Sequence, residues 1–219
     1  GLHSHGALGL VQIFHAGLRA PEVLTGVQPV APSALPCKES RSGMSREAGV
    51  PDIERIVSDF ARAAQRVASA GFDGVELHGA HGYLINQCLG RETNQRRDRS
   101  GGRGGSDSKT GRFRFLLEVI AAVRCAVPPG FLIGLRLSPE RNCGFSLREA
   151  TALCAAVGDQ LDFVHLSVWD AFQPSKEMPR ATVTEACRRA MTHLPPLIVT
   201  GSVWDAEGAA QVLQQGAEL

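Results

Sequence analysis

Five short apolar runs alternate along the chain with longer segments that have the periodicity of helices. The runs that predict strands cover residues 9–15, 74–78, 131–138, 162–168 and 196–201. The segments that predict helices cover residues 52–70, 114–127, 146–157, 183–194 and 205–215. Because no hairpin dipeptide links two of the predicted strands, this alternation predicts an α/β fold with a parallel sheet.

The links between these elements differ in length according to their direction. Links from strand to helix are long at residues 16–50 and 79–112, whereas links from helix to strand are short at 71–73 and 128–130. A (β/α) barrel builds its active site from the loops that follow its strands, so this asymmetry favours a barrel. A doubly wound sheet is the alternative, but it predicts a glycine-rich first turn, where this chain has His15-Ala-Gly-Leu18.

Polar side chains recur on one face of the predicted strands. Successive residues of a strand point to opposite faces, so Val75 and Leu77 share one face while Glu76 and His78 share the other. The same alternation in four strands gives an inward-facing polar set, which is Gln12, Glu76, His78, Arg136, His165 and Ser167. Burying such groups without partners is costly, so they predict a polar ligand at the carboxyl ends of the strands.

Composition narrows the class of protein. The formal charge of the 219 residues is +1, which gives no electrostatic reason to expect a nucleic-acid or membrane-surface partner. No apolar run is long enough to span a membrane. The six cysteines form no CxxC pair, which favours free thiols and a cytoplasmic location.

Two motifs resemble a known family. Residues 71–87 read GFDGVELHGAHGYLINQ and residues 133–139 read IGLRLSP, and both are similar to the old yellow enzyme family of FMN-dependent NAD(P)H:flavin oxidoreductases and ene-reductases. Residues 9–17 (GLVQIFHAG) resemble that family's third strand. The resemblance implies a partial (β/α)8 TIM barrel in which residues 1–219 form one incomplete FMN-binding domain. Strands three to seven would be present, and strands one, two and eight would be missing.

The resemblance also implies a set of cofactor-binding residues. Gln12 would hydrogen-bond the pyrimidine edge of FMN, and Arg136 would place its charge near the N1/O2 side of the flavin ring. Gly201 and Ser202 would offer backbone N–H groups to the FMN phosphate. NADH or NADPH would be the reductant.

The catalytic residues implied by the resemblance follow the strand at 74–78. His78 and His81 would both donate hydrogen bonds to the carbonyl oxygen of an enone, and Tyr83 would donate a proton to its α carbon. The expected substrate is therefore a small electrophilic alkene, and the reaction is reduction of its C=C bond.

Other interpretations of these residues stay open at the level of sequence. His78 and His81 also have the spacing of a zinc-binding pair, although a third ligand is needed and Glu76 is the nearby carboxylate. The chain is alternatively a truncated, non-catalytic barrel remnant or binding module. The Gly- and Ser-rich stretch at 100–111 is expected to be a solvated loop, with docking of a phosphate-bearing cosubstrate as the alternative.

Overall fold

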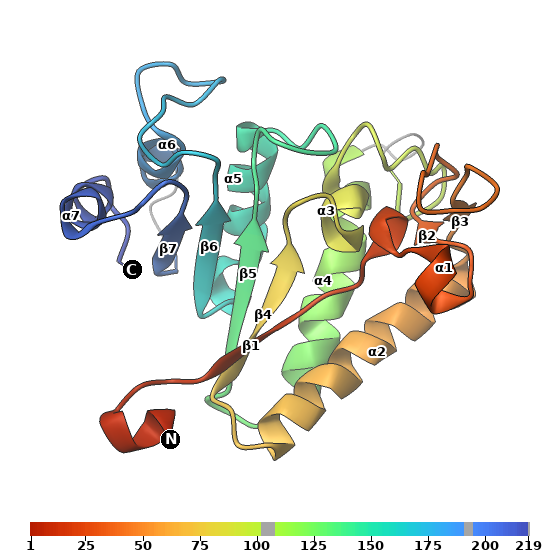
Figure 1. The fold of residues 1–219 in the computed structure, drawn as a ribbon, viewed down its shortest axis with the longest axis horizontal. Helices are drawn as coiled ribbons and strands as arrows, with labels where there is room; N and C mark the ends of the chain where they lie inside the picture. The colour runs from red at the N-terminus through yellow and green to blue at the C-terminus, as the bar shows by residue number, and fades with distance from the viewer. Residues whose placement is uncertain (102–107, 191–194, 219) are drawn as a thin grey trace.

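A parallel sheet of five strands forms the centre of the fold, as the computed structural model of residues 1–101, 108–190 and 195–218 shows (Figure 1). Its strands, in spatial order, are β1 Leu10–Ile13, β4 Gly74–Gly79, β5 Leu132–Leu137, β6 Phe163–Ser167 and β7 Leu197–Thr200. Every neighbouring pair is parallel. The spatial order follows the chain order without a reversal, which is the arrangement of a barrel segment and not of a doubly wound sheet. The predicted partial barrel is therefore confirmed.

The longer helices of the described residues lie between or after the strands of this sheet. They are α2 Val50–Ser69, α3 Leu84–Leu89, α4 Ser108–Ala126, α5 Leu147–Val157, α6 Val183–Ala190 and α7 Ala206–Gln214. Pro51 lies in the first turn of α2, and Gly71 beyond its end has a φ of +83°. The predicted capping box forms at α5, where Ser146 Oγ accepts a hydrogen bond of 3.1 Å from the backbone N–H of Glu149.

The start of α4 differs from the prediction. The helix begins at Ser108 and not at Arg114, although residues 108–113 include a glycine. A side chain at Gly111 would lie 2.2 Å from the carbonyl oxygen of Gly101, so this glycine serves close packing and does not end the helix. Arg112 and Phe113 are both buried and tie this early turn to the core. Residues 102–107 of the Gly- and Ser-rich stretch, and 191–194 of the predicted helix at 183–194, lie outside the described residues.

One face of the sheet packs against the helices. Val75, Leu77 and Ile133 on this face have no solvent exposure. The helices contribute the other half of the core, which includes Ile56, Phe60, Leu116, Val119 and Ile120. None of the described helices is long and apolar enough to cross a membrane.

The link between β1 and α2 contains structure that the sequence did not predict. It holds the short helix α1 Glu22–Thr25 and a two-stranded parallel sheet of β2 Val30–Ala31 and β3 Arg46–Glu47. The buried guanidinium of Arg96 supports this sheet, because it donates to the carbonyl oxygens of Pro32, at 3.0 Å, and Ala48. Three short 3-10 helices complete the elements, and they are η1 Leu2–His5, η2 Gly17–Arg19 and η3 Gly158–Gln160.

The two outer strands of the sheet lead to a prediction about the 219-residue chain. Within the part of the chain that the structure describes, β1 and β7 each pair on one side only, so their other edges carry unpaired backbone groups. Large apolar side chains next to these strands are exposed: Phe14, directly after β1, is 56% exposed, and Trp204, after β7, is 89% exposed. We therefore expect the isolated chain to self-associate in size-exclusion chromatography with light scattering. A monomer that melts cooperatively would contradict this expectation.

Candidate functional site

A line of hydrogen bonds crosses the polar face of the sheet. Glu76 on β4 accepts a hydrogen bond from Gln12 Nε2 on β1, and its second oxygen lies 2.7 Å from His165 Nδ1 on β6. His165 Nε2 is in turn hydrogen-bonded to Thr200 Oγ1 on β7. The parallel register places Gln12 beside Glu76, so the pairing of the strands itself brings these groups together. Four of the five strands are thus joined by side chains on the face predicted to be polar.

A second set of contacts lies nearer the carboxyl ends of the strands. Arg136 on β5 donates from Nη2 to Ser167 Oγ on β6, at 3.1 Å, and His81 Nε2 lies 2.8 Å from the same oxygen. Arg136 Nε is buried and has no hydrogen-bond partner among the described residues. Because buried N–H groups are rarely left without an acceptor, this N–H group indicates a polar partner that is not among the described residues.

The rings of His78, His81 and Tyr83 gather at the carboxyl end of β4, with His78 inside the strand and the other two just after it. The ring centroids of His78 and His81 are 5.0 Å apart, and those of His78 and Tyr83 are 4.8 Å apart. The backbone turns sharply between these rings, because His81 and Gly82 both have left-handed conformations, with φ values of +57° and +74°. A histidine in the left-handed region is strained unless its surroundings hold it, and such strain is concentrated at functional sites.

Burial and neighbouring charges keep the two histidines neutral. Burial lowers the pKa of His78 to about 4, with the charges of His81 and Arg136 acting in the same direction. The pKa of His81 is also lowered, by burial first and then by Arg136, Arg141 and Arg19. Each neutral ring carries one N–H donor and one acceptor. This pair therefore offers two neutral donors at neutral pH.

Glu76, unlike the two histidines, is held in its charged form. Burial disfavours its charged form, but the hydrogen bond from His165 and that from Gln12 outweigh burial and lower the pKa of its carboxyl group. An anionic Glu76 accepts from both neighbours at once. It therefore fixes the Gln12 amide with Nε2 directed at the Glu76 carboxylate. The amide oxygen of Gln12 is then left as an acceptor for a ligand.

The low pKa of His78 predicts how stability varies with pH. Between an unfolded value of about 6.5 and the folded value of about 4, the unfolded state binds more protons, so stability falls as the pH drops through this window. His78→Gln should flatten that part of the curve in denaturant titrations at several pH values. An unaltered slope in His78→Gln would show that His78 does not titrate in this way.

The seven predicted site residues do not all come together. His78, His81 and Tyr83 lie side by side, and Arg136 is joined to His81 through Ser167. Gln12 belongs to the neighbouring line of contacts through Glu76. The other two, Gly201 and Ser202, follow β7 and contact the segment after β6. A side chain at Gly201 would lie 2.6 Å from the Val168 carbonyl oxygen, and Ser202 Oγ donates to the Trp169 carbonyl oxygen at 3.1 Å.

Three neighbours of the site were missed by the sequence reasoning. The ring of Phe14 lies 5.0 Å from that of Tyr83, and Thr200 ends the line of contacts through His165. Arg141 lies 4.9 Å from the ring of Trp169. Strand periodicity puts Thr200 on the polar face with Ser167, so the alternation within the predicted strand at 196–201 was enough to identify Thr200. Phe14 falls inside the predicted strand at 9–15, on the face of Gln12, but only the polar residues of that face were selected. Arg141 lies in the loop between β5 and α5, where strand periodicity gives no information.

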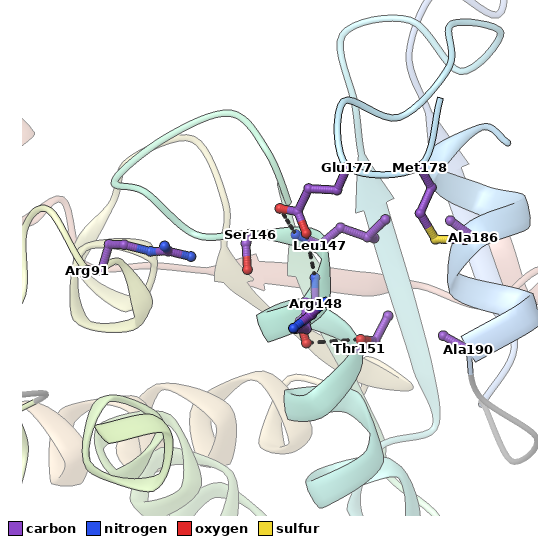
Figure 2. A pocket seen from close by; sticks show the side chains of 9 residues that line it. All are labelled: Arg91, Ser146, Leu147, Arg148, Thr151, Glu177, Met178, Ala186 and Ala190. Carbon is purple, nitrogen blue, oxygen red and sulfur yellow. Dashed lines mark hydrogen bonds between the residues drawn. The ribbon is translucent and has the colours of Figure 1, made fainter. Parts of the chain in front are cut away.

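A separate pocket lies between α5 and α6 and does not include these residues. It has a volume of about 610 Å³, and Figure 2 shows Glu177 reaching the start of α5. The Glu177 carboxylate accepts from the backbone N–H groups of Leu147, at 3.0 Å, and Arg148, at 3.2 Å. These bonds satisfy the first N–H groups of the helix, so they have a structural role. None of the predicted site residues lines this pocket.

Solved structures share this architecture. Morphinone reductase in complex with tetrahydroNAD superposes with a TM-score of 0.79 and 30% identity over 99% of this chain and 61% of its own. The old yellow enzyme homologue from Zymomonas mobilis superposes with a TM-score of 0.78 and 26% identity, covering 98% of this chain and 62% of its own. The family resemblance proposed from the two motifs is therefore confirmed.

Sequence comparison extends along the whole chain. A probable NADH-dependent flavin oxidoreductase of Bacillus subtilis, YqiG, is 36% identical over 100% of this chain and 59% of its own length. The chain thus spans about three-fifths of that relative. The family names support FMN as the cofactor and NADH or NADPH as the reductant. Since the family's model matches residues 1–219 without a gap at either end, this chain belongs to the NADH:flavin oxidoreductase / NADH oxidase family.

Proposed function

We propose that this protein is an FMN-dependent oxidoreductase that uses NADH or NADPH to reduce activated C=C bonds in small enone-type substrates. The observation that carries the proposal is the gathering of His78, His81 and Tyr83 beside Arg136 at the carboxyl ends of parallel strands. Two neutral N–H donors next to a phenol are suited to an oxygen that gains negative charge while a nearby carbon takes up a proton.

The residues of the polar face fit the pyrimidine edge of FMN, which carries both N–H and C=O groups. Gln12 has its amide N–H turned to Glu76, so its oxygen is left to accept from a flavin N–H. Arg136 has a buried Nε that finds no acceptor within the described residues, and its fixed charge suits a ring that becomes anionic on reduction. The backbone N–H groups of Gly201 and Ser202 are proposed to hold the phosphate. When bound, FMN supplies the hydride equivalent that the alkene requires.

The residues after β4 are proposed to bind the substrate and move its proton. His78 and His81 donate to the substrate's carbonyl oxygen and thereby draw electron density away from its β carbon. Tyr83 donates the phenolic proton to the α carbon. The Arg19 guanidinium carbon lies 5.8 Å from the centroid of the Tyr83 ring, and its positive charge favours the negative charge that remains on the phenol after this transfer.

The decisive test is flavin content. The protein, produced with any flanking sequence that its gene encodes, should purify with FMN or take it up from solution, and should oxidise NADH or NADPH when an enone such as cyclohexenone is added. Flavin absorbance and fluorescence quenching measure the first property, and loss of the nicotinamide absorbance measures the second. A protein that stays colourless in excess FMN would overturn the proposal and favour the non-catalytic remnant.

A further inference from the structure

The hydroxyl group of Ser167 joins the two halves of the proposed site. Ser167 is 3% exposed and ends β6, which pairs with β5 in the sheet. Its Oγ lies 3.1 Å from Arg136 Nη2 and 2.8 Å from His81 Nε2. No role for this serine follows from the family motifs, because it lies outside both of them.

The chemistry of the three groups fixes the direction of these hydrogen bonds. A guanidinium has only donors, so Ser167 Oγ accepts from Arg136. The serine has a single O–H, and among the described residues His81 Nε2 is the acceptor within reach of it. Buried hydroxyl protons are normally used in hydrogen bonds, so this proton points to His81 Nε2. A neutral imidazole whose Nε2 accepts must carry its proton on Nδ1.

We propose that Ser167 is a positioning residue that holds His81 as the Nδ1–H tautomer and so aims that N–H at the substrate oxygen. This inference rests on the proposed function, because it assigns His81 to the substrate. The result is a chain of donors in one direction, from Arg136 to Ser167, from Ser167 to His81, and from His81 to the substrate. Hydrogen bonds in such a chain strengthen one another, so the arginine's charge supports the charge that develops on the substrate oxygen.

The tautomer of His78 is also fixed, but it is the opposite one and a different group sets it. His78 Nδ1 accepts the backbone N–H of Ala80 at 3.2 Å, so its proton lies on Nε2. The two histidines therefore donate from opposite ring nitrogens. A backbone group sets the tautomer of His78, whereas a side chain sets that of His81. Only the His81 donor is expected to respond to a substitution at Ser167, which gives the test an internal reference.

The test is to measure the tautomers directly by NMR of the flavin-loaded protein with ¹⁵N-labelled histidine, using His81→Asn to assign the His81 signals. Wild-type protein should show His81 with a protonated Nδ1 and an unprotonated Nε2. Ser167→Ala should shift His81 to the Nε2–H form or to a mixture, and Ser167→Thr should restore the wild-type pattern. His78 should keep its Nε2–H form in all three proteins. An Nε2–H tautomer of His81 in the wild-type protein overturns the proposal whether or not the variants fold.

Ser138→Ala is the matched control. Ser138 is also fully buried, and its Oγ donates to the Ser167 backbone oxygen at 2.8 Å without contacting His81. Ser138→Ala should leave the His81 tautomer unchanged. A shift as large as that in Ser167→Ala would mean that general loosening of the strand, and not the lost hydroxyl, is responsible.

Kinetics give a second readout. Ser167→Ala should lower kcat for the alkene about tenfold, as loss of a group that orients a catalytic imidazole does, while Ser167→Thr retains it. An unchanged tautomer in Ser167→Ala overturns the role of the serine but leaves the proposed function intact. Absence of flavin binding in the wild-type protein overturns the proposed function instead.

Discussion

Tyr83→Phe is expected to slow reduction of an enone by roughly 10²–10⁴-fold, because removal of a positioned general acid has an effect of that size. The substitution keeps the aromatic ring, which lies 4.8 Å from the His78 ring and 5.0 Å from the Phe14 ring, so packing is preserved. The step that consumes NADH or NADPH requires no proton from this phenol and should stay nearly unchanged. Stopped-flow absorbance resolves this step from the one that consumes the alkene.

His78→Ala provides the contrast for that experiment. It removes one of the two proposed donors to the substrate oxygen, which typically lowers the rate by a factor on the order of 100. Unlike Tyr83→Phe, it should also weaken the binding of a phenol, whose oxygen takes the place of the substrate oxygen. If Tyr83→Phe slowed both steps equally, or slowed neither, Tyr83 would be a packing residue of the loop and the assignment as proton donor would be wrong.

The sheet and its polar face were predictable because both follow from alternation along single strands. Val75 and Leu77 are apolar on the helix side, and Glu76 and His78 are polar on the other, so hydrophobic periodicity alone assigned the two faces. The start of α4 was not predictable in this way. Gly111 lowers the helix propensity of its segment, and only the tertiary packing against Gly101 and the burial of Arg112 extend the helix through it.

The arrangement of the site was only partly contained in the sequence. The family motif named His81, but its left-handed φ of +57° and its contact with Ser167 depend on the folded loop. Phe14 lies just beyond the end of β1 but inside the predicted strand at 9–15, whose alternation puts it on the same face as Gln12. It was missed because only the polar residues of that face were selected. Partners that come from different strands, such as Glu76 and His165, require the register of the sheet before they can be paired. Periodicity within one strand does not contain that register.

Glu149 presents the largest expected effect on stability. Its side chain is 7% exposed and forms an ion pair with the equally buried Arg112, whose Nε donates to the Leu89 carbonyl oxygen at 3.0 Å. Arg91 Nη2 and the backbone N–H of Ser146 occupy its second oxygen, at 3.1 and 2.9 Å. This carboxylate therefore joins α4, α5 and the loop after α3. Burial opposes its ionisation, but the hydrogen bonds from Ser146 and Arg91 outweigh burial and lower its pKa.

Glu149→Gln should reduce the free energy of unfolding at neutral pH by about 3–5 kcal/mol, because the charge of Arg112 is left buried without its partner. Denaturant titration of the protein, with any flanking sequence its gene encodes, measures the loss. Glu118→Gln is the matched control, since Glu118 pairs with Arg114 on the partly exposed side of α4 and its loss should cost at most about 1 kcal/mol. Equal losses in the two variants would show that burial of the Arg112 pair contributes nothing.

The lowered pKa of Glu149 predicts how the difference in unfolding free energy between wild type and Glu149→Gln depends on pH. Because the folded pKa of Glu149 lies below its ordinary value of 4.5, the folded state binds fewer protons than the unfolded state just below that pH. The stabilisation by the charged form is therefore complete above the unfolded pKa and is lost as the pH falls through the folded pKa. The two stability curves should run parallel above about pH 5 and converge in acid.

Replacing both partners, as Arg112→Met with Glu149→Leu, should restore part of the loss at neutral pH, because neither charge is then left buried alone. A double variant no more stable than Glu149→Gln would place the contribution of Glu149 in the capping of α5 and not in its pairing with Arg112.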